Sequence, residues 1–561
     1  MLKQNLTRRR LLQTAMAAPF AACAPAIDRK SGDGFILRGG PIWRDARTDN
    51  GAVTLVVRGG KVQYAGPEGG IGSGTSNLRV IDLGGATAFP GFVDAHCHVT
   101  GIGLRELTLD LTGTPSLAAL VDKLRAYAAA HKDGAIIGRG WIETHWPEKR
   151  FPSRADIDTA VADRPVYLER ADGHAAVVNS AALTLAGITD STPDPQGGRI
   201  ERDAKGAATG MLIDNATALV EGKLPAPSAA LKREAVERAV ALYASRGWTG
   251  VGSMSSSVEQ VEALGAMAAA GKPMIRSDHY LDPGAMGDVL ARGPYADKSG
   301  LVRVRGIKLY MDGALGSRGA ALLAPYADMP STSGLLVTPA ETIADLCAKA
   351  RAAGAQVAMH AIGDRGNRLA LDAFEAAFKS AAADTLGAAR WRIEHAQVIP
   401  PADIPRFGKL GVVASMQPSH AIGDLYFAPS RLGPERLKGA YAWKSLLDSG
   451  ATIAAGSDAP VEKGDPRIEF YAATYRHSLD GFAGADWHLE EAVSRAQALH
   501  MLTVGTAHAA FAENERGTLQ PGKRADISVF SKDLLSCEPS EIPKAEALLA
   551  VVDGKVVHSN L

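Results

Sequence analysis

FPGFVDAHCH, residues 89–98, is an apolar segment that ends in His96 and His98. Side chains two positions apart on a β-strand point to the same side, so a strand here brings both imidazoles to one cation. Cys97 then points the other way, and we interpret it as a packing residue. Because His pairs of this kind also occur in protein cores, the pair alone does not establish a metal site.

Seven further apolar segments of strand length follow along the chain, with Ala-rich helical stretches between several of them. Helices are expected over 226–246, 340–353 and 367–382. Strands that alternate with helices form parallel sheets, and eight such strands predict an α/β fold with a TIM-like (β/α)₈ barrel. The strands are expected near residues 90–96, 249–254, 274–280, 302–310, 356–360, 390–395, 411–416 and 452–457.

Both chain ends carry short strand patterns separated by Gly-rich turns, and Asp553-Gly554 is a strong hairpin signal. We therefore predict a small β-sandwich domain built from both ends. The segment from about 100 to 220 is too long for one loop, so we expect an insertion after barrel strand 1, over the barrel mouth. The expected domain ranges are 33–88 and 506–561 for the β-sandwich and 89–505 for the barrel with its insertion.

Polar residues stand where four later barrel strands end. IKLYMDG places Lys308 in strand 4, VAMHAIGD places His360 in strand 5, RIEHAQ places His395 in strand 6, and IAAGSDAP places Asp458 after strand 8. In a (β/α)₈ barrel, residues that end different strands meet at one mouth. Unrelated core or loop residues are the alternative, but the shared position of all these residues favours one site.

These motifs resemble the metal-dependent amidohydrolase superfamily, and specifically the branch of N-substituted formamide deformylase (amidohydrolase family 3). The resemblance covers nearly the whole chain after the expected signal at residues 1–26. The motifs that carry it are FPGFVDAHCH (89–98), DGHAAVVNSAAL (172–183), KLYMDGALGSR (308–318), HAIGDRGN (360–367), EHAQ (394–397), QPSH (417–420), GSDAPV (456–461) and PGKRADI (521–527).

The resemblance implies that His96 and His98 bind one divalent metal and that His360 and His395 bind a second. Lys308 stands where many relatives carry a carboxylated lysine that bridges the two metals. Imidazole and carboxylate ligands suit zinc, while iron, manganese and nickel remain open. The number of metals, one or two per chain, is open as well.

Asp458 stands where the family has a catalytic acid/base that also contacts a metal. A metal cation lowers the pKa of bound water toward about 7 and polarises a carbonyl as a Lewis acid. Asp458 is expected to take the proton of the attacking water and pass it to the departing amine.

Three further residues are candidates for substrate contact. His174, in the DGH motif, is expected to hydrogen-bond the substrate carbonyl or a developing oxyanion, and a loop-ordering role is the alternative. Arg318 after strand 4 is a candidate for a substrate carboxylate, with a loop salt bridge equally open. His420 after strand 7 either lines the pocket or packs within its loop.

Three classes of function remain to be distinguished. We expect a hydrolase that cleaves a carbon–nitrogen bond, of the amide or formamide type, in a small organic substrate. A deaminase or a lactone or ester hydrolase with the same metals is the alternative, although the presence of Lys308 favours the two-metal amide hydrolase. A non-catalytic exported binding protein is the third, and the complete set of site residues argues against it. The oligomeric state is open, although members of the superfamily often form homodimers.

The composition agrees with an enzyme that acts on small molecules. The chain has 561 residues, of which 46% are hydrophobic and 22% charged, and Lys plus Arg equals Asp plus Glu at 61 each. A net charge of zero provides no global basic field for nucleic acid or an anionic membrane. Four Cys among 561 residues cannot form a disulfide framework.

Residues 1–26 have the features of an export signal. TRRRLLQ at 7–13 resembles the twin-arginine consensus, and the apolar stretch TAMAAPFAACAPA follows it. The sequence Phe20-Ala21-Ala22-Cys23 resembles a lipobox, although Leu is usual where Phe20 stands. We expect an exported, periplasmic protein. Lipidation at Cys23, which would give a membrane-anchored lipoprotein, and ordinary cleavage after residue 26 are both open.

Overall fold

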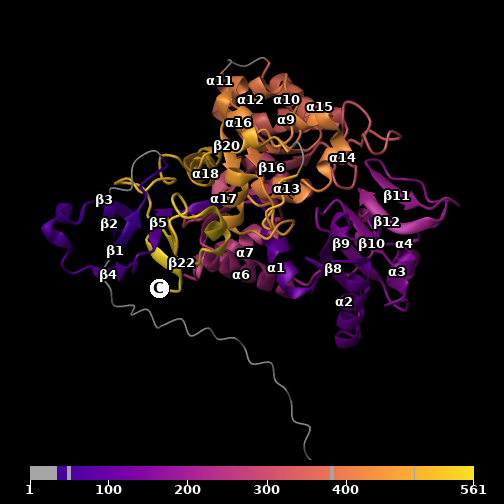
Figure 1. The fold of residues 1–561 in the computed structure, drawn as a ribbon, viewed down its shortest axis with the longest axis horizontal. Coiled ribbons are helices and arrows are strands. Elements are labelled where there is room, and N and C mark those ends of the chain that lie inside the picture. Colours follow the sequence, from indigo (N-terminus) through magenta and orange to yellow (C-terminus); the bar gives the residue numbers. More distant parts are fainter. Residues whose placement is uncertain (1–33, 47–51, 380–383, 485–486) are drawn as a thin grey trace, which may run out of the picture.

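The computed structural model describes residues 34–46, 52–379, 384–484 and 487–561. These residues form a central barrel with a β-sandwich at one end of the long axis and the insertion at the other (Figure 1). The predicted signal at 1–26, with Cys23, lies outside the described residues. Among the described helices, none combines the length and the apolar character that a membrane crossing requires.

Eight parallel strands form the barrel, and each lies within three residues of its predicted start. An isolated parallel bridge between Cys97 and Ala459 brings the last strand back to the first. Two backbone hydrogen bonds support this closure, from His98 N to Ala459 O (2.7 Å) and from Asp458 N to His96 O (2.6 Å). The strands are, in spatial order, β6 (Phe92–Cys97), β13 (Trp248–Ser256), β14 (Arg276–Leu281), β16 (Val302–Tyr310), β17 (Gln356–Ala361), β18 (Arg392–His395), β19 (Val413–Met416) and β20 (Ile453–Ala455).

Helices cover the outside of the barrel, which explains why its strands are apolar almost throughout. Serine caps begin three of them, because Ser228 accepts from Leu231 N, Ser257 from Gln260 N and Ser494 from Gln497 N. The helices are α1 (Val99–Leu107), α6 (Ala229–Ser245), α7 (Val258–Ala269), α8 (Gly287–Arg292), α9 (Ala340–Ala352), α10 (Asp364–Phe378), α11 (Asp384–Ala389), α12 (Ile404–Leu410), α13 (Pro418–Asp424), α14 (Ala428–Leu432), α15 (Pro434–Leu437), α16 (Trp443–Asp448), α17 (Pro466–Tyr475), α18 (Arg495–Leu502) and α19 (Val504–Ala509).

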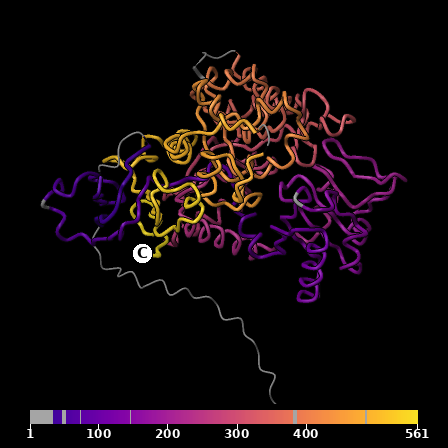
Figure 2. Tube along the Cα trace, viewed as in Figure 1, coloured from indigo at the N-terminus to yellow at the C-terminus, as the bar shows by residue number. Residues whose placement is uncertain are grey.

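The β-sandwich consists of two four-stranded sheets, and Figure 2 shows the first and last parts of the chain side by side in it. One sheet has the order β3-β2-β1-β4 and the other β23-β22-β21-β5. The strands are β1 (Gly34–Ile42), β2 (Ala52–Arg58), β3 (Lys61–Gly66), β4 (Arg79–Asp82), β5 (Thr87–Pro90), β21 (Ile527–Phe530), β22 (Ala547–Val552) and β23 (Lys555–Ser559).

Apolar side chains from both chain ends form one buried core between these sheets, including Leu37, Leu55, Ile527 and Val551. β5 pairs with β21, so the β-sandwich extends to Pro90, two residues past the expected boundary at 88. Asp553 and Gly554 have φ of 53° and 73°, the left-handed geometry of a tight hairpin between β22 and β23.

The insertion has a six-stranded sheet of its own, with the order β11-β12-β10-β9-β8-β7. Separate apolar cores on this sheet include Leu120, Leu168 and Met211 on one side and Leu183 and Leu212 on the other. Its elements are β7 (Leu109–Asp110), α2 (Leu117–Ala130), β8 (Ile136–Trp141), α3 (Arg154–Asp158), β9 (Val166–Arg170), β10 (Ala175–Val178), α4 (Ser180–Ala186), β11 (Gly198–Arg202), β12 (Ala208–Asp214) and α5 (Ala218–Glu221).

The predicted architecture is confirmed: a (β/α)₈ barrel, a β-sandwich from both chain ends, and an insertion after barrel strand 1. A two-residue strand, β15 (Tyr295–Ala296), pairs antiparallel with β16. Short 3₁₀ turns complete the described elements, at Glu68–Gly70, Ser73–Thr75, Glu143–His145, Leu489–Glu491 and Pro539–Lys544.

Candidate metal centre

One cavity of about 830 Å³ opens at the carboxyl ends of the barrel strands. Its wall is shared, because strands β8, β9 and β12 of the insertion contribute side chains beside those of the barrel. The structure brings all the predicted metal ligands to this cavity: His96, His98, Lys308, His360, His395 and Asp458.

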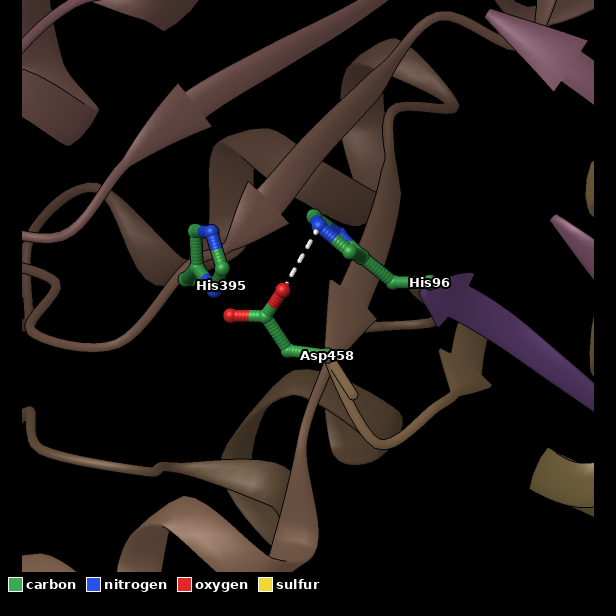
Figure 3. Close-up of side chains that lie close together, drawn as sticks. All are labelled: His96, His395 and Asp458. Atoms are coloured by element: carbon green, nitrogen blue, oxygen red, sulfur yellow. Dashed lines mark ion pairs between the residues drawn. The ribbon is translucent and has the colours of Figure 1, made fainter. Parts of the chain in front are cut away.

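Three of these residues form a compact set of donor atoms. His96, His395 and Asp458 each offer one ligand atom, and these atoms all lie within 4.8 Å of one another. Figure 3 shows the three side chains pointing toward one another from three different barrel strands or strand ends. His96 Nε2 lies 3.3 Å from Asp458 Oδ1, and His98 Nε2 lies 3.1 Å from the same oxygen. Two nitrogens and one carboxylate oxygen therefore converge.

The Nδ1 atoms of two imidazoles, those of His96 and His395, each have a hydrogen-bond partner in the protein. His96 Nδ1 lies 2.6 Å from Glu394 Oε2, and His395 Nδ1 lies 2.8 Å from Gln417 Oε1. This orients Nε2 as the remaining donor atom of each ring, as in protein metal sites where a second group fixes the histidine. His96 Nε2 is buried and has no hydrogen-bond partner. An unpartnered, buried imidazole nitrogen beside a carboxylate fits a metal cation.

Glu394, which contacts a residue of the donor set, was not among the site residues that the sequence analysis selected. Arg392 donates from Nη2 to Glu394 Oε2 at 3.1 Å, and both side chains are buried. Burial raises the pKa of the Glu394 carboxyl, but the charges of Arg392 and His96 lower it by a larger amount. The net pKa therefore lies well below its usual range. Glu394 is therefore ionised and accepts the Nδ1 proton of His96. The available signal was a pair of opposite charges, Arg392 and Glu394, within the segment WRIEH where a barrel strand is expected.

His360 faces the same centre from β17. Its ring lies 4.6 Å from that of His395, centroid to centroid, and its Nε2 lies 3.7 Å from Asp312 Oδ1. Burial is the main cause that lowers the pKa of His360 well below its usual value. The imidazole is therefore neutral, which is the form that binds metals.

Lys308 is 1% exposed and projects from β16 into the cavity. Burial lowers the pKa of its amine to about 8, although the charges of Glu394 and Asp458 act in the opposite direction. Its Nζ lies 5.1 Å from the ring centre of Tyr310. The lowered pKa increases the fraction of unprotonated amine near neutral pH, and the unprotonated amine is the form that lysine carboxylation requires.

The backbone at two strand ends adopts the left-handed region, which non-glycine residues rarely occupy. φ is 71° at His395 and 57° at Asp458. This geometry costs on the order of 1 kcal/mol or more per residue and is most frequent at functional sites. Burial raises the pKa of Asp458, but the interactions with His96 and His98 lower it by a larger amount. Its net pKa therefore lies well below the usual value.

His174 enters the cavity from the insertion. Its ring centre lies 4.9 Å from that of His360, and its Nδ1 lies 2.7 Å from Asp214 Oδ1. Burial lowers the pKa of His174, whereas the hydrogen bond and charge of Asp214 raise it, with a net rise. Asp214 holds the ring with Nε2 as its remaining donor, so His174 can contribute a proton or a hydrogen bond there.

The other two substrate candidates, Arg318 and His420, are not among the residues that line the cavity. Arg318 Nη2 lies 2.9 Å from Asp328 Oδ2, and Arg318 is not among the residues that line the cavity. The structure therefore gives Arg318 the salt-bridge arrangement. His420 Nε2 lies 3.7 Å from Asp458 Oδ2, and its ring stacks 5.8 Å from His395. His420 thus lies next to Asp458 and His395, but it is not among the residues that line the cavity.

Residues 79–558 match the model of the amidohydrolase family. YtcJ of Bacillus subtilis (strain 168), which is named as an amidohydrolase, is 35% identical over 496 residues, 86% of this chain and 91% of that protein. N-substituted formamide deformylase of Arthrobacter pascens is 30% identical over 540 residues, 91% of this chain and 95% of the enzyme.

A solved structure of a metal-dependent hydrolase from Pyrococcus horikoshii OT3 shares the fold, with a TM-score of 0.73 and 28% identity over 90% of this chain and 99% of that one. This match extends over the barrel, the β-sandwich and the insertion together. With the donor set at the barrel mouth, these similarities show that the chain belongs to the amidohydrolase family and is a metal-dependent hydrolase of the kind that acts on carbon–nitrogen bonds.

Proposed function

We propose that this enzyme hydrolyses an amide or formamide bond in a small organic substrate. The observation that carries the proposal is the donor set of His96, His395 and Asp458, in which a buried imidazole nitrogen has no partner and a carboxylate stands beside it. A relative that matches nearly the full length is named N-substituted formamide deformylase, which supports the formamide chemistry.

Within this site, a bound divalent cation, with zinc best suited to these ligands, supplies water of lowered pKa and Lewis-acid polarisation of a carbonyl. Asp458 accepts the proton that the attacking water loses and returns it to the leaving nitrogen, because its carboxylate is ionised and lies within the donor set. His174 donates from Nε2 to the carbonyl oxygen, where negative charge develops as the bond breaks. The cavity of about 830 Å³ accommodates a small molecule.

We also propose that Lys308 is carboxylated and that the site holds two cations. The support is geometric, because the Lys308 side chain is buried at the cavity that His360, on the neighbouring strand, and the donor set also line, and its amine forms no ion pair with a described residue. Carboxylation converts the buried cation into an anionic oxygen ligand. Growth with ¹³C-bicarbonate tests this: a carbamate carbon resonance that disappears in Lys308→Ala supports it, and its absence from metal-replete enzyme contradicts it.

The substrate class is tested by a screen of metal-replete enzyme against matched N-formyl amines, N-acetyl amines, ring amidines and lactones. The proposal predicts turnover of N-formyl or N-acyl amines, with release of a free amine. Turnover confined to ring amidines or lactones contradicts it and identifies a deaminase or a lactonase instead. Asp458→Asn enzyme, prepared in parallel, controls for a contaminating hydrolase.

We propose further that residues 1–26 direct export by the twin-arginine route. The mass of the mature protein, recovered from an expressing cell, tests both variants of this proposal. A lipid-sized mass increase on a chain that begins at Cys23 indicates an anchored lipoprotein, and a chain that begins after residue 26 indicates a free periplasmic enzyme. A mature chain that retains residues 1–26 contradicts export.

A further inference from the structure

Arg139 lines the cavity from strand β8 of the insertion. Its side chain is largely buried, yet its Nη1 has no hydrogen-bond partner. Its one ion pair among the described residues joins Nε to Glu169 Oε2 over 3.4 Å, a distance too long for a strong bidentate pair. A guanidinium has five N–H donors, so this group retains most of its binding capacity.

The position of this pair connects it to the reaction centre. Arg139 on β8 and Glu169 on β9 are directly paired in the register of the two strands. A Cβ atom built on Gly173 would lie 3.2 Å from Glu169 Oε1, so this carboxylate lies beside Gly173. Gly173 directly precedes His174 in the sequence. The same cavity thus contains the donor set at its barrel end and Arg139 on its insertion wall.

The other carboxylates of the insertion that line the cavity already have partners. Asp172 Oδ2 accepts from Arg170 Nη1 at 2.5 Å, Asp214 holds His174, and Glu221 accepts from the Tyr167 hydroxyl. Glu169 is therefore the competitor for Arg139, and Arg139 is the one guanidinium among the described residues of the cavity wall. A ligand carboxylate can use the donors that Glu169 leaves free.

We propose that Arg139 is a specificity residue that binds a carboxylate of the substrate, remote from the bond that is cleaved. This inference rests on the proposed amide hydrolase and names its substrate class: N-formyl or N-acyl amines whose amine part carries an anionic group. Glu169, which lies near Nε of the guanidinium, competes with that anion and limits the affinity of Arg139 for it. The anion would bind on strand β8 of the insertion, whereas the donor set lies on barrel strands and strand ends.

The test uses three probes that differ at one end: 6-formamidohexanoate, its methyl ester, and N-formyl-1,6-diaminohexane. Binding is measured by calorimetry on metal-loaded Asp458→Asn protein, in which turnover does not interfere. The carboxylate is expected to bind about 10- to 100-fold more tightly than the ester, as for a charge-assisted pair in a buried site. Arg139→Gln is expected to remove this preference and leave the affinity for the ester unchanged, and Arg139→Lys to keep part of it.

Glu169→Gln distinguishes recognition from a structural role. Removal of the competing carboxylate is expected to tighten binding of 6-formamidohexanoate, whereas a residue needed only for folding would weaken all three probes. Arg125→Gln, on the exposed side of α2, is the control for loss of an insertion arginine and leaves all three affinities unchanged. Equal affinity for carboxylate and ester, preference for the ammonium probe, or weaker carboxylate binding in Glu169→Gln would overturn the proposal.

Wild-type turnover separates the two proposals. Hydrolysis of the ester and the carboxylate with equal kcat/KM supports the amide hydrolase and contradicts the role of Arg139. Tight, Arg139-dependent binding of the carboxylate without hydrolysis of any probe supports the role of Arg139 and contradicts the amide hydrolase.

Discussion

His96 Nδ1 lies 2.6 Å from Glu394 Oε2, although 298 positions separate the two residues in the chain. The contact joins the first barrel strand to the sixth, and it orients an imidazole whose other nitrogen faces Asp458. Arg392 keeps Glu394 ionised, so the hydrogen bond is charge-assisted. The metal centre therefore depends on a carboxylate that does not itself belong to the donor set.

Glu394→Gln is predicted to weaken metal binding while the ligands remain in place. Loss of such a supporting carboxylate typically costs about 10- to 100-fold in metal affinity or activity. Competition with a chromophoric chelator measures the affinity, and excess metal is expected to restore activity. Glu435→Gln, an exposed carboxylate paired with Lys438, is the matched control. An unchanged affinity in Glu394→Gln would exclude the orienting role.

Asp458→Asn is predicted to abolish measurable turnover, since a positioned acid/base contributes about 10²- to 10⁴-fold and the amide cannot accept a proton. Bound metal is expected to remain mostly intact, because the histidines of the donor set are unchanged. Steady-state kinetics and elemental analysis of the same preparation check the two parts. Wild-type kcat in this variant refutes the proton-transfer role of Asp458.

His174→Gln is predicted to lower kcat by about 10²- to 10³-fold, the usual cost of one lost donor to a developing oxyanion. Metal content is expected to stay at the wild-type level, because His174 lies outside the compact donor set. His131→Gln, at the exposed end of α2 in the same insertion, is the control. A higher KM with an unchanged kcat would instead show that His174 binds the substrate in the ground state.

Asp278→Asn is predicted to destabilise the fold in a pH-dependent manner. Asp278 accepts from Arg303 Nε and Arg516 Nη2, both at 2.6 Å, and the variant leaves these guanidinium groups without their buried partner. Breaking such a pair costs about 3–5 kcal/mol, measured as the free energy of unfolding in urea near pH 7. Asp448→Asn, an exposed carboxylate, is the control and changes it by less than about 0.5 kcal/mol.

The pH dependence follows from the pKa of Asp278. Burial raises this pKa, but the charges of Arg303 and Arg516 lower it by a larger amount. The net pKa therefore lies well below the pKa of an aspartate in the unfolded chain. The stabilisation is therefore complete above about pH 4 and is lost as the pH falls through the lowered pKa. The difference in free energy of unfolding between wild type and Asp278→Asn is expected to become smaller when the urea unfolding is repeated at lower pH, down to pH 3. A constant difference would show that the carboxylate charge is not the cause.

Much of the fold was predictable because parallel barrel strands are covered on both faces. The apolar segments at β16 and β17 follow directly from this, and the geometry of a barrel then places Lys308 and His360 at one mouth. The strand β1 was not predicted, because Gly39, Gly40 and Pro41 interrupt its apolar pattern where the register shifts.

The supporting contacts could not be predicted, since they depend on how distant strands are paired. Glu394 reaches His96 only because the barrel closes, and Arg139 reaches the cavity only because the insertion sheet forms part of its wall. Arg318 has the same side-chain chemistry and follows a barrel strand, which made it the more obvious substrate residue, yet Asp328 pairs with it outside the cavity. Residue type and strand position therefore predict which side chains reach the barrel mouth better than they predict which side chains form the insertion wall of the cavity.

The central claim is that the donor set of His96, His395 and Asp458 holds a divalent metal that hydrolysis requires. Elemental analysis of the purified enzyme and of His96→Ala, paired with an assay of N-formyl amine hydrolysis on the same samples, tests it most directly. The account predicts at least one metal per wild-type chain, and joint loss of metal and activity in His96→Ala. Less than one metal per wild-type chain together with no hydrolysis across the amide panel, or full activity in metal-free His96→Ala, would contradict it.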